Sequence, residues 1–230
     1  MVLVNSTKNE IRLSRIQKLI GKRMALSKAT KPCFYLSAKA DVTELLKLRP
    51  KLRKSLGVKI TTNAFYLRAL GLATEKYPLM LGRLEAGNIK IAEQINIGFA
   101  VNAPQGLVVP IVKNVNEKTL AQIAEDEKQL TEKGLSNKLT VAELEGETIA
   151  LSNLGAYGID SFIGIIPPPA SAILSVGNAI NEIVPIDGQP AARKRVSLTI
   201  AVDHCVINGD YAAKFLSCIK EYLQNPQRLL

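Results

Sequence analysis

The sequence predicts an α/β (α+β) fold in which one mixed β-sheet is flanked by helices. Segments with a helical apolar period alternate along the whole chain with apolar or alternating segments typical of strands. Of the 230 residues, 47% are hydrophobic and 22% are charged, an ordinary globular composition with enough apolar side chains for a sizeable core. No repeat or linker divides the chain, so we expect one domain over residues 1–230, with 1–10 as a flexible arm.

The first third of the chain is expected to contain three helices and one strand. In chain order these are a helix over residues 11–29, a strand over 33–40, and helices over 41–56 and 63–76. An acidic residue in its first turn supports the second helix. Pro50 is expected to interrupt that helix, because proline lacks the backbone N–H that a helix interior needs.

The rest of the chain is expected to form most of the sheet. Strand patterns lie at residues 89–91, 95–101, 107–112, 146–152, 172–177 and 193–202, with helices at 119–133 and 211–223. Residues 186–189 have the composition of a hairpin turn. Pro167–Pro169 is expected to be a stiff, extended connector.

The chain carries 30 basic and 20 acidic side chains, a net charge of +10, which favours an anionic partner. The basic residues are densest before Lys59 and are not interleaved with aromatic residues, and no nucleic-acid-binding motif is present. A coenzyme phosphate or an acidic partner domain is therefore favoured, and nucleic acid is ranked last.

The three cysteines, Cys33, Cys205 and Cys218, are odd in number and lack C-x-x-C spacing. A disulfide framework or a zinc site is therefore not expected, and a reducing compartment is favoured. No apolar run reaches the roughly 18 residues that a membrane span needs. The first residues lack the charged start and apolar region of a secretory signal, so we expect a cytoplasmic protein that does not enter a membrane.

Residues 201–210 contain the only histidine of the chain, His204. An apolar run leads into the histidine, Asn208-Gly209 is a strong turn signal, and residues 211–223 have a helical pattern. We therefore expect His204 where a buried strand gives way to a turn and a helix, a rigid position for a proton-transfer group. A core histidine satisfied by hydrogen bonds is the alternative for an isolated histidine.

Residues 146–158 are the second informative stretch. A β-rich run ends there in Ser152-Asn153-Leu154-Gly155, and the glycines at 155 and 158 allow close backbone approach. For Ser152, a hydroxyl that satisfies a strand end is the structural alternative to a functional role.

Four segments in one order carry a resemblance: Leu13–Arg23, Gly106–Val112, Leu151–Ile159 and Asp203–Gly209. Together they resemble the catalytic inner-core domain of the dihydrolipoamide acyltransferases of 2-oxo acid dehydrogenase complexes. His-x-x-x-Asp/Asn-Gly alone is shared with chloramphenicol acetyltransferase and other acyltransferases of that fold. Ser-Asn-Leu-Gly-x-Tyr-Gly-Ile, and the Ala-Ala-x-Phe-Leu after the histidine, resemble the acetyltransferases of pyruvate dehydrogenase more than the succinyl or branched-chain forms.

The resemblance implies a chloramphenicol-acetyltransferase-like fold that forms trimers, which assemble into a larger hollow core. It also implies acetyl transfer between dihydrolipoamide and coenzyme A, both of them substrates, with no metal. The family's lipoyl and peripheral-subunit-binding domains have no counterpart in the sequence, so the lipoyl group is expected on a separate or missing domain. The implied partners are further copies of the chain and a lipoyl domain, and indirectly pyruvate dehydrogenase and dihydrolipoamide dehydrogenase. A longer precursor with a transit peptide would place the protein in the mitochondrial matrix.

The resemblance also implies roles for individual residues. His204 corresponds to the general base that takes a proton from the attacking thiol, and Ser152 to the hydroxyl that stabilises the oxyanion. Asn208 would orient the imidazole or its loop. Three further residues are implied in structural roles: Arg23 as a partner near position 208, and Leu229 and Leu230 as contacts that dock into a neighbouring trimer.

Two positions depart from the family pattern. Position 208 is Asn where Asp is frequent, although Asn also occurs there and still forms hydrogen bonds. Position 205 is Cys where Arg is usual, which puts in doubt any ion pair of that arginine. We interpret Cys205 as a small buried hydrophobic residue and not as a nucleophile, because a residue that follows the base on a strand points to the opposite face.

Three other functions remain open on the sequence. The chain could be a core-forming subunit with little activity, an acyltransferase with succinyl or branched-chain specificity, or a free-standing acyltransferase for small molecules. The retained histidine favours an active acetyltransferase, and the cysteine at position 205 keeps the structural subunit open.

Overall fold

A computed structural model describes residues 12–13 and 15–230 of the chain. The arm expected over residues 1–10 lies outside the described residues. The helices are α1 (Arg15–Thr30), α2 (Thr43–Leu56), α3 (Thr62–Lys76), α4 (Leu120–Leu135) and α5 (Gly209–Gln224). The strands are β1 (Cys33–Asp41), β2 (Gly82–Glu85), β3 (Asn88–Ile91), β4 (Ile97–Phe99), β5 (Val101–Ala103), β6 (Gly106–Val108), β7 (Ile111–Val112), β8 (Ile149–Asn153), β9 (Ala172–Ile186) and β10 (Gln189–Asp203).

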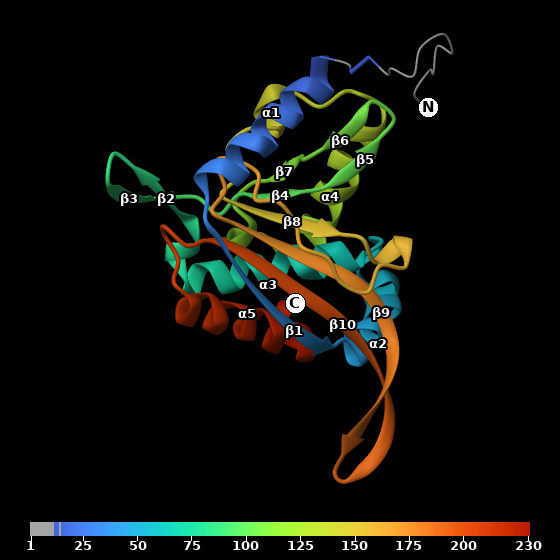
Figure 1. Ribbon diagram of the computed structural model, residues 1–230. Helices are drawn as coiled ribbons and strands as arrows, with labels where there is room; N and C mark the ends of the chain where they lie inside the picture. Colours follow the sequence, from blue (N-terminus) through green and yellow to red (C-terminus); the bar gives the residue numbers. More distant parts are fainter. Residues whose placement is uncertain (1–11, 14) are drawn as a thin grey trace.

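A six-stranded sheet forms the centre of the molecule, in the order β1-β10-β9-β8-β4-β7. Strand β8 runs parallel to both β9 and β4, whereas the other neighbours are antiparallel. Figure 1 shows α3 and α5 next to each other along this sheet. The expected mixed sheet with flanking helices is therefore confirmed.

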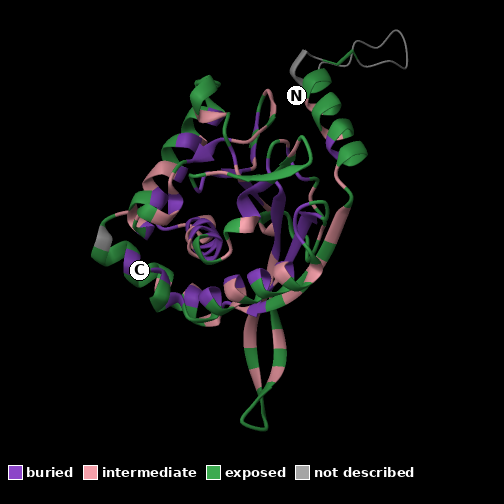
Figure 2. Cartoon of the chain, turned by 90° about the vertical axis from the view of Figure 1, so that its left-hand side faces the viewer, coloured by how far each residue is buried: buried purple, intermediate pink, exposed green. Residues whose placement is uncertain are grey.

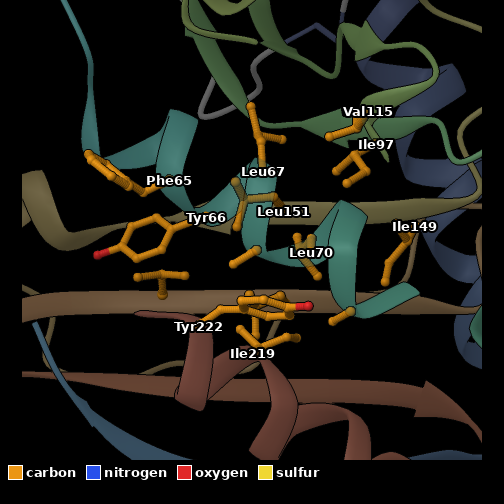
Figure 3. Close-up of a cluster of buried hydrophobic side chains, with 14 of the residues drawn as sticks. Phe65, Tyr66, Leu67, Leu70, Ile97, Val115, Ile149, Leu151, Ile219 and Tyr222 are labelled. Atoms are coloured by element: carbon orange, nitrogen blue, oxygen red, sulfur yellow. The ribbon is translucent and has the colours of Figure 1, made fainter. Parts of the chain in front are cut away.

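The core lies between the sheet and the helices α3 and α5. Helix α3 begins at its cap Thr61, whose hydroxyl accepts a hydrogen bond from the N–H of Ala64 at 3.0 Å, and most of its side chains are buried. Figure 3 shows the central cluster, which joins α3, α5 and the strands. It contains Phe65, Tyr66, Leu67, Leu70, Ile97, Val115, Ile149, Leu151, Ile219 and Tyr222, all of them buried.

Strands β9 and β10 continue beyond the body of the molecule as a long hairpin (Figures 1 and 2), and its far end is largely exposed. The sequence patterns covered only residues 172–177 and 193–202 of these strands. In the outer part the apolar side chains, such as Ile183, stay exposed or half-exposed, and the ladder of backbone hydrogen bonds holds the two strands together. The expected turn is confirmed, with Asp187 and Gly188 both at positive φ.

Two of the expected strands are divided in the structure. Residues 95–101 separate into β4, in the main sheet, and β5, which pairs with β6 in a small hairpin. Residues 107–112 separate likewise into β6 and β7, with Pro110 at the break, where a strand residue would have to donate a backbone N–H. Strand β2, which pairs with β3, was not predicted.

The expected interruption of the second helix at Pro50 is wrong, because α2 is continuous through that residue. Pro50 lies on the exposed side of α2. Leu45 and Leu52, one before and one after the proline, are both buried in the core. Their burial holds the two halves of the helix on one axis against the local cost of the missing hydrogen bond.

Leu229 is not exposed for contact with a neighbouring trimer, contrary to the expectation for this residue. The chain turns through a short 3-10 helix, η5 (Pro226–Leu229), back onto α2, α3 and α5, and Leu229 is fully buried there in the chain's own core. Leu230 is 52% exposed, so an inter-trimer contact stays a prediction for Leu230 alone.

The two terminal leucines therefore form a matched pair for a test of stability. Leu229→Ala should lower the free energy of unfolding by about 2–5 kcal/mol, because it removes buried methyl groups and leaves a cavity. Leu230→Ala should change it by less than about 0.5 kcal/mol, as is usual for exposed side chains. Urea denaturation followed by circular dichroism, at one protein concentration, measures both. Equal effects of the two substitutions would contradict the placement of Leu229.

Candidate active site

His204 lies in the turn between the end of β10 at Asp203 and the start of α5 at Gly209, as the sequence predicted. Its side chain is exposed, and its ring lies against that of Phe34 on β1, with the ring centroids 5.2 Å apart. Its backbone N–H donates to the carbonyl of Pro32 at 2.9 Å. The position is thus rigid at the backbone and open at the imidazole.

The turn that carries His204 is held from within by Asp203. The carbonyl of Asp203 accepts hydrogen bonds from the N–H groups of Val206 and Ile207, and its carboxylate accepts one from the N–H of Cys205 at 3.1 Å. The Asp203 side chain is 6% exposed and pairs with Lys31, whose Nζ lies 3.0 Å from Oδ2. Sequence reasoning missed both residues, because nothing in the sequence indicates that they lie side by side.

Asn208 is the N-cap of α5. Its side-chain oxygen accepts a hydrogen bond from the N–H of Tyr211 at 2.9 Å, which satisfies one of the free donors of the first helical turn. This bond fixes the end of the His204 turn. A direct role of Asn208 toward the imidazole stays a prediction.

Ser152 lies half-buried on β8, next to Ser175 of β9 in the register of the sheet. Ser175 is in turn opposite Thr199 of β10, and Thr199 is opposite Ser37 of β1. The four hydroxyls therefore form a row across one face of the sheet. The hydroxyls of Ser175 and Thr199 have hydrogen-bond partners, whereas that of Ser152 has none among the described residues, so it is free to donate to a ligand.

A polar network behind Ser152 fixes the loop that follows it. Asn153 donates from Nδ2 to Oδ1 of Asn63 at 2.8 Å and accepts at its own Oδ1 from the N–H of Gly155 at 2.9 Å. Thr61, which caps α3, donates from its hydroxyl to the buried carboxylate of Glu127 on α4. Burial raises the pKa of Glu127, and hydrogen bonds from Thr61 and Asn63 partly oppose the increase.

Two glycines let this loop pack directly on the sheet. A Cβ atom on Gly155 would lie 2.7 Å from the carbonyl oxygen of Gly177 on β9, and one on Gly177 would lie 1.9 Å from the carbonyl oxygen of Asp160. Both distances are too short for any side chain. The close approach that the sequence suggested for Gly155 is therefore present.

His204 and Ser152 lie far apart within one chain. Ser152 is level with Thr199 but two strands away, and His204 follows Thr199 by five residues. At about 3.3 Å per residue along a strand and about 4.8 Å between strands, the two residues are about 19 Å apart. No hydrogen bond or shared ligand atom can join them within one copy.

Arg23 does not contact position 208, contrary to its expected role. It donates from Nη2 to Oε1 of Glu147 at 3.4 Å and to the carbonyl of Pro168, and thereby joins α1 to the loops that flank β8. The position of Arg23 on α1 brings its side chain to these loops. The side-chain oxygen of Asn208 already accepts a hydrogen bond from α5. Burial raises the pKa of Glu147, which the charge of Arg23 opposes.

Cys205 is exposed, so its interpretation as a small buried hydrophobic residue is wrong. Strand β10 ends at Asp203, and the alternation of faces along a strand therefore does not apply to a residue in the turn. Desolvation, followed by the negative charge of Asp203, raises the pKa of the Cys205 thiol. A thiol that resists deprotonation is poorly suited to nucleophilic attack.

The described residues hold no group of three or more His, Cys, Asp or Glu side chains placed to bind a metal ion. In the same part of the chain, no helix combines the length and the apolar character needed to cross a membrane.

The family model for the 2-oxoacid dehydrogenases acyltransferase (catalytic domain) matches residues 5–230. Over 99% of its length the chain is 34% identical to the dihydrolipoyllysine-residue acetyltransferase component of the pyruvate dehydrogenase complex of Rickettsia felis. That relative is longer, and the match spans 57% of it, so the chain covers just over half the length of this curated relative.

Solved structures agree with this match. The dihydrolipoamide acetyltransferase of Azotobacter vinelandii, described with a serine, a histidine and an asparagine in its catalytic mechanism, superimposes with a TM-score of 0.91 at 30% identity, covering 96% of this chain and 93% of that one. The cubic core of a pyruvate dehydrogenase multienzyme complex gives a TM-score of 0.91 at 31% identity, with the same two coverages. A chloramphenicol acetyltransferase gives 0.58 at 13% identity over 88% of this chain and 94% of that one, which shows the shared fold.

The buried carboxyl group behind Ser152 makes the stability of the protein depend on pH. Because burial raises the folded-state pKa of Glu127 above the ordinary value of a glutamate, its stabilising contribution is present at lower pH and is lost as the pH rises through the folded-state value. Glu127→Gln cannot ionise and should therefore gain stability relative to wild type as the pH is raised from about 5 to about 8. Urea midpoints at several pH values measure this difference.

Glu132→Gln is the matched control for Glu127→Gln, because Glu132 lies on the exposed side of the same helix. It should leave the pH dependence of the urea midpoint as in wild type. A Glu127→Gln curve parallel to that of wild type would show that Glu127 does not ionise differently in the folded protein.

Proposed function

Because this chain belongs to the family of 2-oxoacid dehydrogenase acyltransferase catalytic domains, we propose that it transfers an acetyl group between dihydrolipoamide and coenzyme A. The observation that carries the proposal is a shared spacing. The serine, histidine and asparagine of the Azotobacter vinelandii enzyme's mechanism are separated by the same numbers of residues as Ser152, His204 and Asn208. The name of the Rickettsia relative supports acetyl as the acyl group.

The proposed reaction begins when neutral His204 takes the proton from the thiol of one substrate. The thiolate attacks the carbonyl carbon of the other substrate's thioester, and the carbonyl oxygen becomes an oxyanion. Ser152 donates a hydrogen bond to this oxyanion from its free hydroxyl. As the carbon–sulfur bond to the leaving group breaks, the departing thiolate takes this proton from His204 and leaves as a thiol.

A second copy of the chain has to complete this site. Because Ser152 and His204 are about 19 Å apart within one chain, we place the reaction between His204 of one copy and Ser152 of the next. The loop that follows Ser152 exposes Tyr157, Ile159, Ile163 and Ile165, an apolar surface suited to contact with that copy. A trimer closes such a head-to-tail contact, and the cubic core of the relative supports a larger assembly.

The remaining partners are proposed on the same ground. A lipoyl domain would present the dihydrolipoyl arm, and pyruvate dehydrogenase and dihydrolipoamide dehydrogenase would act on it indirectly. All three cysteines are free, which supports a reducing compartment, the cytoplasm or the mitochondrial matrix. Leu230 remains the proposed contact between trimers.

Activity measurements on single variants test the assigned roles. We expect wild type to acetylate dihydrolipoamide from acetyl-CoA faster than it transfers succinyl or branched acyl groups. His204→Ala should lower kcat by at least about 10²-fold because the base is lost. Ser152→Ala should lower it by about 10²- to 10³-fold, the usual effect of removing one oxyanion donor.

Cys205→Ser is the control for the single variants and should keep kcat close to wild type, because the thiol takes no part in the reaction. Light scattering should show that all variants assemble as wild type does. A fully assembled wild type without activity would overturn the proposal and leave a structural core subunit as the function of the chain.

Mixed assemblies test the shared site directly. Equimolar His204→Ala and Ser152→Ala chains, unfolded together and refolded, should regain a substantial part of the activity that each variant lacks alone. Some contacts between copies would then pair an intact His204 with an intact Ser152. As a control, wild type is refolded with the double variant His204→Ala/Ser152→Ala. The activity of that mixture should fall as the share of the double variant rises, because fewer contacts then join two intact residues. Absence of recovery in well-assembled mixtures would contradict a site between copies.

A further inference from the structure

The ion pair between Lys31 and Asp203 directly adjoins His204. Asp203 directly precedes the histidine, and Lys31 directly precedes Pro32, whose carbonyl accepts the N–H of His204 at 2.9 Å. The segment of residues 31–32 therefore holds residues 203–204 at two points, one through side chains and one through the backbone. Next to them, Cys33 and Asp203 are opposite each other in the register of β1 and β10.

Both members of the pair are largely withdrawn from water. The Lys31 side chain is 13% exposed and that of Asp203 is 6% exposed. Removing one partner from such a pair leaves an uncompensated buried charge, which is strongly unfavourable. The carboxylate of Asp203 would then lose the contact that fixes its direction, and its hydrogen bond from the N–H of Cys205 would no longer be held in place.

The imidazole of His204 depends on this arrangement because little else holds it. Its ring contacts Phe34, and its side chain makes no hydrogen bond with the described residues. The direction of the ring is therefore set by the backbone of the turn. Asp203 holds that backbone twice, because its carbonyl oxygen and its carboxylate both accept hydrogen bonds from N–H groups of the turn. A small displacement of a catalytic base has a large effect on rate.

We propose that Lys31 is a positioning residue for His204, which it fixes through Asp203. The proposal rests on the acyl transfer proposed above. The cation beside Asp203 is Lys31, whereas the neighbouring Cys205 carries no positive charge and is exposed.

The first test compares Lys31→Met with Lys39→Met. Lys39 is a residue of β1 and forms an ion pair with Glu182 of β9. Its side chain is half-exposed, and Glu182 lies in the outer part of the long hairpin. Lys31→Met should lower kcat by about 10- to 100-fold with little change in KM for acetyl-CoA or dihydrolipoamide. Lys39→Met should keep the wild-type kcat. Lys31→Arg, which retains the charge, should recover most of the activity.

The double variant Lys31→Met/Asp203→Asn separates positioning from stability. Replacing a buried ion pair by neutral groups commonly leaves stability unchanged, so this variant should fold and assemble even where Lys31→Met does not. We expect it to stay as slow as Lys31→Met, because the fixed link between residues 31 and 203 is gone. Recovery of kcat together with stability would overturn the proposal, as would a wild-type kcat in Lys31→Met.

Chemical modification of the single histidine gives a readout that needs no turnover. The rate at which diethyl pyrocarbonate modifies His204, followed by ultraviolet absorbance at one pH, should differ between wild type and Lys31→Met and should be unchanged in Lys39→Met. An inactive wild type in which Lys31→Met still changes this rate would refute the acyl transfer alone. Identical modification rates in all three proteins would refute the positioning role alone.

Discussion

The register of β10 between β1 and β9 is the constraint on which the rest of the structure depends. It turns Val196, Leu198, Ile200 and Val202 toward the core and sends the alternate residues to the opposite face. A slip of one residue would exchange the two faces and bury the polar set. The same register aligns the hydroxyl row with Ser152 and delivers His204 to the turn at the end of the strand, so that core and site are fixed by one set of backbone hydrogen bonds.

Buried carboxylates support both halves of the site, and they are stabilised in different ways. Asp203, beneath the His204 turn, is paired with the ammonium group of Lys31, 3.0 Å away. Among the described residues, the partners of Glu127 behind the Ser152 loop are a hydroxyl and an amide, neither of them a cation, and burial raises its pKa. The turn thus depends on an ion pair and the loop on a network that tolerates protonation.

The separation of Ser152 and His204 along the sheet links the proposed acyl transfer to the proposed assembly. A single chain places the open imidazole of His204 in the turn after β10 and, two strands away on β8, the hydroxyl of Ser152, which has no partner among the described residues. The apolar residues of the loop after Ser152, among them Tyr157 and Ile163, are exposed on the isolated chain. Contact with another copy would cover them and bring the two groups together, so one surface would serve both activity and oligomerisation.

The sequence by itself determined the mixed α/β fold, the main helices, and the position of His204 between a strand, a turn and a helix. These depend on local periodicity, turn residues and one motif, and such signals lie within a few neighbouring residues. Only the tertiary structure decided the burial of Leu229, the exposure of Cys205, the contacts of Arg23 with Glu147 and Pro168, and the pairing of Lys31 with Asp203. Each of these is a contact between residues distant in the chain, or the lack of one, and is set by strand register and packing, which no local pattern encodes.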